Sequence, residues 1–258
     1  VSVRSKSYYL LGQLAALMKQ PVQAVKWLAK VPADDDHGVD AGVQRAILLQ
    51  QLGKSDKAHA VIAQLSADMQ GKQEVERKLV QVDAEIYMRD KRYRQAIAAY
   101  TRALALDKSN PDLYYGRGMA HASAGRTDAA IADFRHVLKL RPDDLDAVNA
   151  LGYTLADANR DLPEARRLLA RVHKALPDNA AITDSWGWLQ YRLGHLGKAE
   201  AALLNSWNAQ KDPEVGAHLV RVLIARGKHA QARRVYAVAL KLDPDNPRLK
   251  SLKGMLKP

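Results

Sequence analysis

Residues 113–144 have the sequence LYYGRGMAHASAGRTDAAIADFRHVLKLRPDD, in which Gly125 separates two amphipathic segments. The second segment carries apolar residues at spacings i, i+4 and i+7, the spacing of one helix face: Ala130, Phe134 and Val137. The first segment carries Gly118, whose lack of a side chain lets another helix lie close against it. This stretch therefore predicts a helix, a short turn and a second helix that packs on the first.

The same pattern recurs along the whole chain with a period of about 34 residues. The alanine of the second segment occurs in seven copies: Ala24, Ala58, Ala96, Ala130, Ala165, Ala199 and Ala232. A residue that is usually small marks the matching place in the first segment: Gly12, Ala46, Ala84, Gly118, Gly152, Gly187 and Val220. Glycines expected in turns separate the segments of four units: Gly53, Gly125, Gly194 and Gly227. In such an array each unit buries its apolar face against the next.

This repeat resembles the tetratricopeptide repeat family, whose units place a bulky residue, Leu-Gly, an aromatic residue, Ala, Phe, Ala and Pro at fixed spacings. Residues 113–144 carry the pattern almost complete, and so do the runs AVNALGYTLA and PEARRLLARVHKALPDN of the next unit. The resemblance covers residues 5 to about 246. It implies an all-α fold, a right-handed α-α superhelix (TPR solenoid) whose first helices line the concave surface and whose second helices form the convex one.

We expect residues 1–258 to form a single solenoid of about seven helix-turn-helix repeats plus a short C-terminal capping helix. The expected repeats are residues 5–38, 39–72, 77–110, 111–144, 145–179, 180–212 and 213–246. The cap is expected in residues 247–258, where Leu249, Leu252 and Leu256 have helical spacing. In three units a charged residue stands where the family usually has leucine: Arg45, Asp83 and Arg117.

The composition is that of a globular helical protein, with 47% hydrophobic residues, 26% charged residues and a single phenylalanine. Cysteine is absent, which excludes disulfides and thiolate chemistry. No apolar run approaches the roughly 20 residues that a membrane-spanning helix needs. Because the chain opens on Val1 without a charged-then-apolar leader, we expect that it is truncated at the N-terminus, that further repeats precede it and that a targeting signal has been removed.

The formal net charge of +12 leaves two interpretations open. It describes either a soluble basic surface without a dedicated ligand or a surface that meets an anionic partner. Basic residues gather on two of the second segments, where we expect them to be exposed: Arg166, Arg167, Arg171, Lys174, Arg233, Arg234 and Lys241. Nucleic-acid binding is not favoured, because no aromatic side chains interleave with these charges.

Two tryptophans, Trp186 and Trp188, flank Gly187. Residues i and i+2 of a helix point about 200° apart, so the two indoles cannot share one buried face. Trp186 is predicted to lie in the core, because it has the repeat phase of three leucines: Leu11, Leu151 and Leu219. Trp188 has the phase that faces the concave groove in the family it resembles, and is predicted to bind a partner.

The groove phase and its helical neighbours select aromatic and polar residues in the last four units: Tyr115, Met119, Asn149, Tyr153, Asp184, Trp188, Tyr191 and Arg221. Aromatic anchors carry much of the binding energy at protein interfaces, so these residues are predicted to form a protein-binding surface. The alternative is that Tyr153 and Trp188 pack across adjacent first helices and close a tight superhelix. Both interpretations can hold together, because a stacked aromatic ladder can bind on its open edge.

The sequence predicts no catalytic, cofactor or metal site. It contains no H-E-x-x-H, P-loop, G-x-S-x-G or G-x-G-x-x-G motif, and its eight scattered histidines are expected on helix surfaces. Carboxylate runs at residues 34–36 and 143–144 are expected to cap helices. Some tetratricopeptide proteins capture the C-terminal carboxylate of chaperones with lysine, asparagine and arginine, but here Asn149 lacks the matching pairs in its neighbouring units. The prediction is a non-enzymatic scaffold or adaptor.

Two further runs, D-S-x-G-W at residues 184–188 and D-P-E-V-x-A-H-L at residues 212–219, resemble the C-terminal part of a group of Gram-negative tetratricopeptide lipoproteins. That resemblance implies a periplasmic adaptor, anchored to the outer membrane through a lipidated cysteine in a missing N-terminal segment. It also implies a carboxy-terminal processing protease and its cell-wall hydrolase substrates as partners. The alternatives are a cytoplasmic location and a module that binds an anionic polymer or surface, such as lipopolysaccharide, peptidoglycan or RNA, with a steep dependence on salt.

Overall fold

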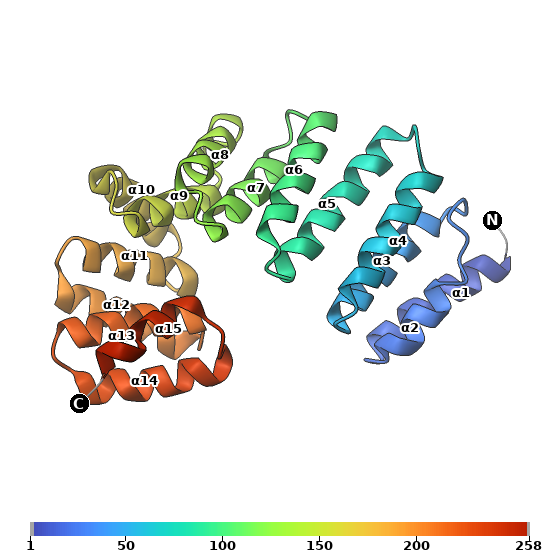
Figure 1. The fold of residues 1–258 in the computed structure, drawn as a ribbon. Helices are drawn as coiled ribbons and strands as arrows, with labels where there is room; N and C mark the ends of the chain where they lie inside the picture. The colour runs from blue at the N-terminus through green and yellow to red at the C-terminus, as the bar shows by residue number, and fades with distance from the viewer. Residues whose placement is uncertain (1–2, 257–258) are drawn as a thin grey trace. The chain divides into compact units, whose positions relative to one another are not determined.

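The computed structural model describes residues 3–256, and within that range every regular element is helical (Figure 1). Fourteen helices follow one another as seven pairs, in which odd-numbered helices are the first and even-numbered helices the second members. A short fifteenth helix and a final 3-10 turn follow them. The predicted all-α class and the predicted number of helices are confirmed. Within the described range, no helix combines the length and the hydropathy needed to cross a bilayer.

The chain divides into two compact units, Val1–Asp133 and Phe134–Pro258, and the division falls inside α8 (Thr127–Leu140). The other helices of the first unit are α1 (Val3–Leu17), α2 (Pro21–Leu28), α3 (Gly38–Gln51), α4 (Ser55–Asp68), α5 (Gln73–Arg89), α6 (Tyr93–Leu106) and α7 (Pro111–Ser123). The second unit continues with α9 (Leu145–Asp157), α10 (Leu162–Ala175), α11 (Ala180–Arg192), α12 (Leu196–Ala209), α13 (Pro213–Ala225), α14 (His229–Leu242), α15 (Pro247–Leu252) and η1 (Lys253–Leu256). The single continuous solenoid over residues 1–258 stays a prediction.

The alanines that define the repeat form the centre of each helix pair. All seven are 0% exposed: Ala24, Ala58, Ala96, Ala130, Ala165, Ala199 and Ala232. In α10 the residues four and seven positions after the alanine, Leu169 and Val172, are buried with it, as the spacing predicts. In the first helices, Leu151 and Leu219 are buried, but Leu11 of α1, which has the same repeat phase, is 39% exposed.

Besides Asp161 before α10, at φ 38°, the turn inside each pair passes through one residue in the left-handed region, with φ between 54° and 78°. These residues are Lys19, Gly53, Lys91, Gly125, Asn159, Gly194 and Gly227. Glycine adopts this conformation without strain, which explains why four of the seven turns use it. The remaining three turns keep the same geometry with lysine or asparagine, so the turn is a property of the repeat rather than of glycine alone.

The small residue of the first helix permits the close contact that the sequence predicts. A Cβ atom added to Gly187 would lie 2.7 Å from Cγ of Leu203 in α12, and one added to Gly152 would lie 2.7 Å from Cγ of Leu169 in α10. The expected contacts between first and second helices are therefore confirmed.

The predicted cap is also present in the described residues, where three leucines are buried: Leu249, Leu252 and Leu256. Residues 257–258 of the predicted cap lie outside the described residues.

Candidate protein-binding site

Trp188 of α11 is buried rather than exposed in a groove. It is 2% exposed, and its ring stacks on His218 of α13 at 4.2 Å and on Tyr191 at 5.0 Å between ring centroids. Its indole Nε1 donates a hydrogen bond to Oδ1 of Asp157 at 3.0 Å. The prediction that Trp188 is an exposed binding anchor is wrong, because side chains from neighbouring first helices cover its ring.

Three first helices of the second unit meet in a buried polar chain beside this indole. The carboxylate of Asp184 lies 2.9 and 3.1 Å from Nδ1 of His218, whose Nε2 lies 3.3 Å from the hydroxyl of Tyr153 in α9. A carboxylate only accepts hydrogen bonds, so we assign the imidazole proton to Nδ1 and leave Nε2 to accept from the tyrosine. Burial raises the pKa of Tyr153 well above its ordinary value, and the nearby charge of Asp157 adds to this effect.

Two predictions about the residues of this hydrogen-bonded chain are wrong. Asp184 was expected to face the groove and His218 to lie on a helix surface, but they are 8% and 1% exposed. The physical reason is that each supplies the partner the other needs for burial, which removes the cost of taking two polar groups out of water.

Arg248 of α15 closes the network from outside the repeats. Its Nη1 and Nη2 donate to the two oxygens of Asp157 at 3.1 and 2.7 Å, and Nη2 also donates to the Tyr153 hydroxyl at 3.1 Å. Its Nε lies 2.8 Å from Oε2 of Glu214 in α13. Burial alone would raise the pKa of Asp157, but the hydrogen bonds and charge of Arg248, with smaller contributions from His218 and Trp188, outweigh it and lower that pKa. The buried network of the second unit thus consists of Tyr153, Asp157, Asp184, Trp188, Glu214, His218 and Arg248.

The repeat phase predicted Trp186 in the core, but the structure does not place it there. Its ring stacks on His173 of α10 at 5.4 Å, and the side chain keeps part of its surface exposed. The phase placed it correctly on the side of α11 away from Trp188, but that side borders the second helix of the preceding pair. The roles predicted for the two indoles are therefore reversed with respect to burial.

The other predicted groove residues are distributed over both units. In the second unit Tyr191, Arg221 and Asn149 are partly exposed, and Oδ1 of Asn149 is buried without a hydrogen-bond partner. In the first unit Tyr115 is partly buried on α7, and Met119 is 37% exposed. Their role in binding a partner stays a prediction.

The sequence reasoning missed Asp157, Glu214, His218 and Arg248 as members of this network. Arg248 lies 91 residues after Asp157, so no local pattern connects them. A signal was nevertheless present, because the runs 184–188 and 212–219 hold four members of the network: Asp184, Trp188, Glu214 and His218.

Three repeats of the first unit have a charged residue where the family usually has leucine, and these residues differ in whether they have a partner. Arg117 of α7 donates from Nε and Nη2 to Asp133 of α8 at 2.9 and 2.7 Å. Asp83 of α5 lies 2.5 Å from Nδ1 of His59. Arg45 of α3 differs, because its Nε is buried and no described side chain gives Arg45 a hydrogen bond or an ion pair.

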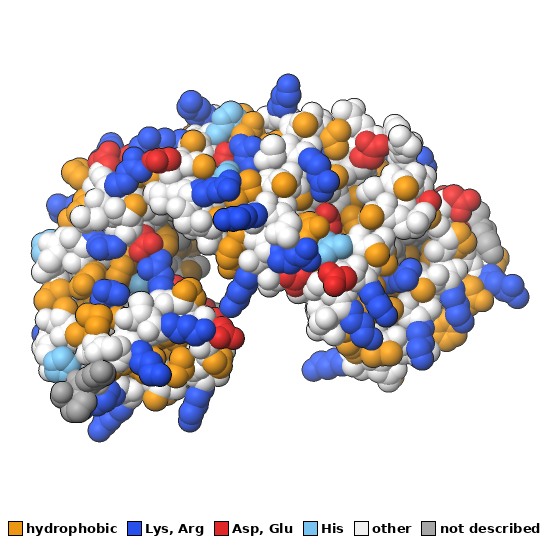
Figure 2. All heavy atoms as spheres, in the orientation of Figure 1, with side chains coloured by type: hydrophobic (Ala, Val, Ile, Leu, Met, Phe, Trp, Pro, Cys, Tyr) orange, Lys and Arg blue, Asp and Glu red, His pale blue; other side chains and the backbone are white. Residues whose placement is uncertain are grey.

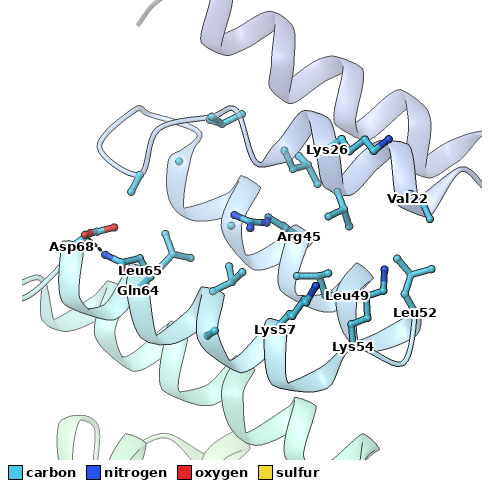
Figure 3. A pocket seen from close by; sticks show the side chains of 18 residues that line it. Val22, Lys26, Arg45, Leu49, Leu52, Lys54, Lys57, Gln64, Leu65 and Asp68 are labelled. Atoms are coloured by element: carbon cyan, nitrogen blue, oxygen red, sulfur yellow. Dashed lines mark hydrogen bonds between the residues drawn. The ribbon is translucent and has the colours of Figure 1, made fainter.

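Arg45 lies in a groove of about 610 Å³ between α2 and α4, with α3 as its floor (Figure 3). Most of the lining is apolar or small: Val22, Val25, Leu28, Val31, Ala33, Gly38, Gly42, Leu49, Leu52, Ala60, Val61 and Leu65. The polar lining consists of Lys26, Arg45, Lys54, Lys57, Gln64 and Asp68. Four cations against one carboxylate make this groove electropositive.

Basic side chains are otherwise dispersed. Figure 2 shows lysine and arginine scattered among apolar and neutral groups over the face in view. The expected exposure of the second-helix cations is confirmed for Arg166, Arg167, Arg233 and Arg234. Arg171 is also exposed and pairs with Asp143 at 2.6 Å. Within residues 3–256, no three histidine, aspartate or glutamate side chains gather closely enough to hold a metal ion.

The helix pairs share buried alanines, close packing of the two helices at a small residue, and a turn residue with positive φ. These features define a class of helical repeat proteins. Two family models described as tetratricopeptide repeat match the chain, one at residues 84–150 and the other at residues 121–185 and 208–256. The chain is therefore built from tetratricopeptide repeats, a type of domain that binds protein partners.

Among known proteins, the chain is 32% identical over 213 residues to TPR repeat-containing protein PA4667 of Pseudomonas aeruginosa, a match that covers 83% of this chain and 35% of that protein. It is 31% identical over 98 residues to bacteriophage adsorption protein A of Escherichia coli, covering 38% of this chain and 10% of that protein. The matched stretch thus spans about a third of the first relative and a tenth of the second.

A solved tetratricopeptide repeat protein from Parabacteroides merdae has a TM-score of 0.82 over 98% of both chains. The two chains are 12% identical, so this likeness concerns the fold alone.

Proposed function

We propose that this chain is a non-enzymatic scaffold that binds a protein partner on the first helices of its second unit. The observation that carries the proposal is the position of Tyr191. Its ring stacks on the buried Trp188 at 5.0 Å and keeps part of its own surface exposed. Trp188 is held by the hydrogen bond to Asp157 and by the stacked ring of His218. The aromatic ring left at the surface therefore rests on a fixed base.

Such a ring suits binding for two physical reasons. Tyrosine and arginine are over-represented among the residues that dominate interface energies. A ring that is already held in place loses less conformational entropy when a partner covers it. Arg221 of α13 adds a partly exposed guanidinium that pairs with no described side chain. The binding role predicted for Trp188 thus passes to Tyr191, with Trp188 as its support.

As a finer proposal, the partner is a carboxy-terminal processing protease together with its cell-wall hydrolase substrates, in the periplasm of a Gram-negative bacterium. The full protein would be anchored to the outer membrane by a lipid. What supports this proposal is the resemblance of residues 184–188 and 212–219 to the tetratricopeptide lipoproteins, and the fact that these runs build the base under Tyr191.

Site-specific photocrosslinking tests both the scaffold proposal and the finer proposal about its partner. A photoreactive amino acid is placed at position 191 or 221, and at exposed Arg233 of α14 as the control, and the chain is incubated with a Gram-negative envelope extract. We expect a discrete crosslinked protein from positions 191 and 221 and none from position 233. In addition, Tyr191→Ala should weaken binding of the captured protein by about 10-fold or more without loss of helicity.

The outcomes distinguish failure of the scaffold proposal from failure of the finer proposal. Capture of a protein that is neither a protease nor a cell-wall hydrolase would reject the finer proposal and keep the scaffold. Equal crosslinking from all three positions, or from none, would reject the first-helix surface as the binding site.

A second candidate function rests on the exposed cations Arg166, Arg167, Arg233 and Arg234, which pair with no described acid. An anionic polymer or surface such as lipopolysaccharide, peptidoglycan or RNA would bind them through charge alone. Its affinity should then fall steeply between low and moderate salt, whereas a contact anchored by Tyr191 should depend on salt only weakly.

A further inference from the structure

Arg45 is the one charged residue at the leucine position of the first unit that lacks a counter-charge among the described residues. Arg117 and Asp83 show what the fold normally supplies there, since each has an oppositely charged or imidazole partner within 3.0 Å. A buried guanidinium nitrogen without an acceptor costs free energy, because it has lost its hydrogen bonds to water. The position of Arg45 therefore indicates an acceptor that the chain itself does not provide.

The surroundings of Arg45 specify the chemistry of that acceptor. In Figure 3 Arg45 lies between the two flanking helices, with Lys54 and Lys57 toward one end of the groove and Asp68 at the other. Asp68 accepts a hydrogen bond from Gln64 at 2.9 Å, and no described acid pairs with Lys26, Lys54 or Lys57. An occupant must offer negative charge in the middle and at the lysine end, and apolar surface elsewhere.

We propose that the groove between α2 and α4 binds an acidic amphipathic segment of a protein partner, with one of its carboxylates paired to Arg45. A guanidinium and a carboxylate match in geometry and form two parallel hydrogen bonds. The apolar side chains of the segment would pack on Val25, Leu49 and Val61, as helices do in apolar grooves. A single acyl chain fits less well, because it carries its charge at one end whereas the cations here are spread along the groove. This site is separate from the Tyr191 surface, so either proposal can fail without the other.

Fluorescence anisotropy with a defined probe tests the proposal. The probe is a labelled synthetic amphipathic helix with leucines on one face and glutamates beside them, and its partner probe has glutamine in place of every glutamate. The full chain is compared with Arg45→Gln, Lys57→Gln and the matched control Arg94→Gln, which removes one exposed positive charge of α6 outside the groove. We expect Arg45→Gln to weaken binding of the glutamate probe by about 10-fold or more, because it removes one partner of a buried charge pair.

Lys57→Gln should weaken the same probe only a few-fold, because the lysine lies at the exposed rim. Arg94→Gln should leave the affinity unchanged, and the glutamine probe should bind every variant weakly. Should Arg45→Gln fail to fold, Arg45→Leu restores the apolar residue usual at this position and should lose binding while melting at a higher temperature.

Three results would overturn the proposal. They are absence of binding of the glutamate probe to the unmodified chain, an equal loss in Arg94→Gln and Arg45→Gln, and Arg45-dependent binding to phosphatidylglycerol vesicles in preference to the probe. The last result would assign the groove to a lipid instead. The crosslinks from position 191 should be the same in Arg45→Gln, which keeps a failure here distinct from a failure of the scaffold surface.

Discussion

The buried polar network of the second unit and Arg45 of the first unit treat buried charge in opposite ways. In the second unit Asp157, Asp184 and His218 each have partners, and Arg248 is brought in from α15 to complete the set. In the first unit Arg45 is held in an apolar groove with no described partner. Pairing within the chain offsets the cost of taking a buried polar group out of water, whereas a group left unpaired destabilises the fold until something else pairs with it. The proposal that Arg45 is a binding residue therefore rests on its lack of a partner within the described residues and not on its exposure.

The largest effect is expected from truncation of the buried indole. Trp188→Ala removes a ring that is 2% exposed and also takes a hydrogen bond from Asp157, so it should lower the free energy of unfolding by about 3–5 kcal/mol. Trp186→Ala is the matched control, and should cost only about 1–2 kcal/mol because that ring keeps part of its surface in water. Urea unfolding followed by circular dichroism gives both values. If Trp186→Ala lowered the free energy of unfolding more than Trp188→Ala, the assignment of Trp188 to the structural network would be contradicted.

The next effect is expected at the contact that closes the network. Arg248→Gln removes the guanidinium from Asp157, Tyr153 and Glu214, and should cost about 1.5–3 kcal/mol. Lys250→Gln on the same helix breaks only an exposed pair with Asp245 and should cost less than about 0.5 kcal/mol. Hydrogen exchange should show faster opening of α9 and α15 in Arg248→Gln alone. Similar exchange in both variants would mean that the arginine does not tie α15 to the first helices.

A smaller effect is expected from pH, through the same carboxylate. The pKa of Asp157 is lowered in the folded chain, so its contribution is present above the unfolded value of about 3.9 and is lost as pH falls through the folded value. The stability difference between the unmodified chain and Asp157→Asn should be constant near neutral pH and shrink below about pH 4. Asp245→Asn, at an exposed carboxyl, serves as the control. A difference that persists undiminished at acid pH would show that charge is not what Asp157 contributes.

Most of the fold could be predicted from the sequence, because the repeat fixes it locally. The i, i+4, i+7 spacing after each alanine depends only on helix geometry, and all seven alanines are fully buried. Seven copies in phase also support one another, so that the third unit could be recognised although its turn, at Lys91, lacks a glycine. Leu11 in α1 shows the limit, since a helix face is buried only where another element covers it.

The site could be predicted only in part, because a phase gives a direction on one helix and not what lies beyond it. The phase separated Trp186 from Trp188 correctly but assigned burial to the wrong indole, since the cover of Trp188 comes from His218 on another helix. Arg45 was visible in the sequence as a departure from leucine, as were Asp83 and Arg117. That Arg45 alone lacks a partner depends on which side chains meet in space, and only the structure shows it.

The same substitution at the same repeat position of two units tests the central claim most directly. Arg45→Leu should raise the free energy of unfolding by about 0.5–1 kcal/mol, since it removes a buried donor that has no acceptor. Arg117→Leu should lower it by about 3 kcal/mol, since it leaves the buried Asp133 without its main partner. Urea unfolding of the two variants, with hydrogen exchange of α3 and α7 to locate each change, gives both signs. Opposite signs would confirm that only one of these arginines is paired within the chain, and a loss of stability in both variants would contradict the account.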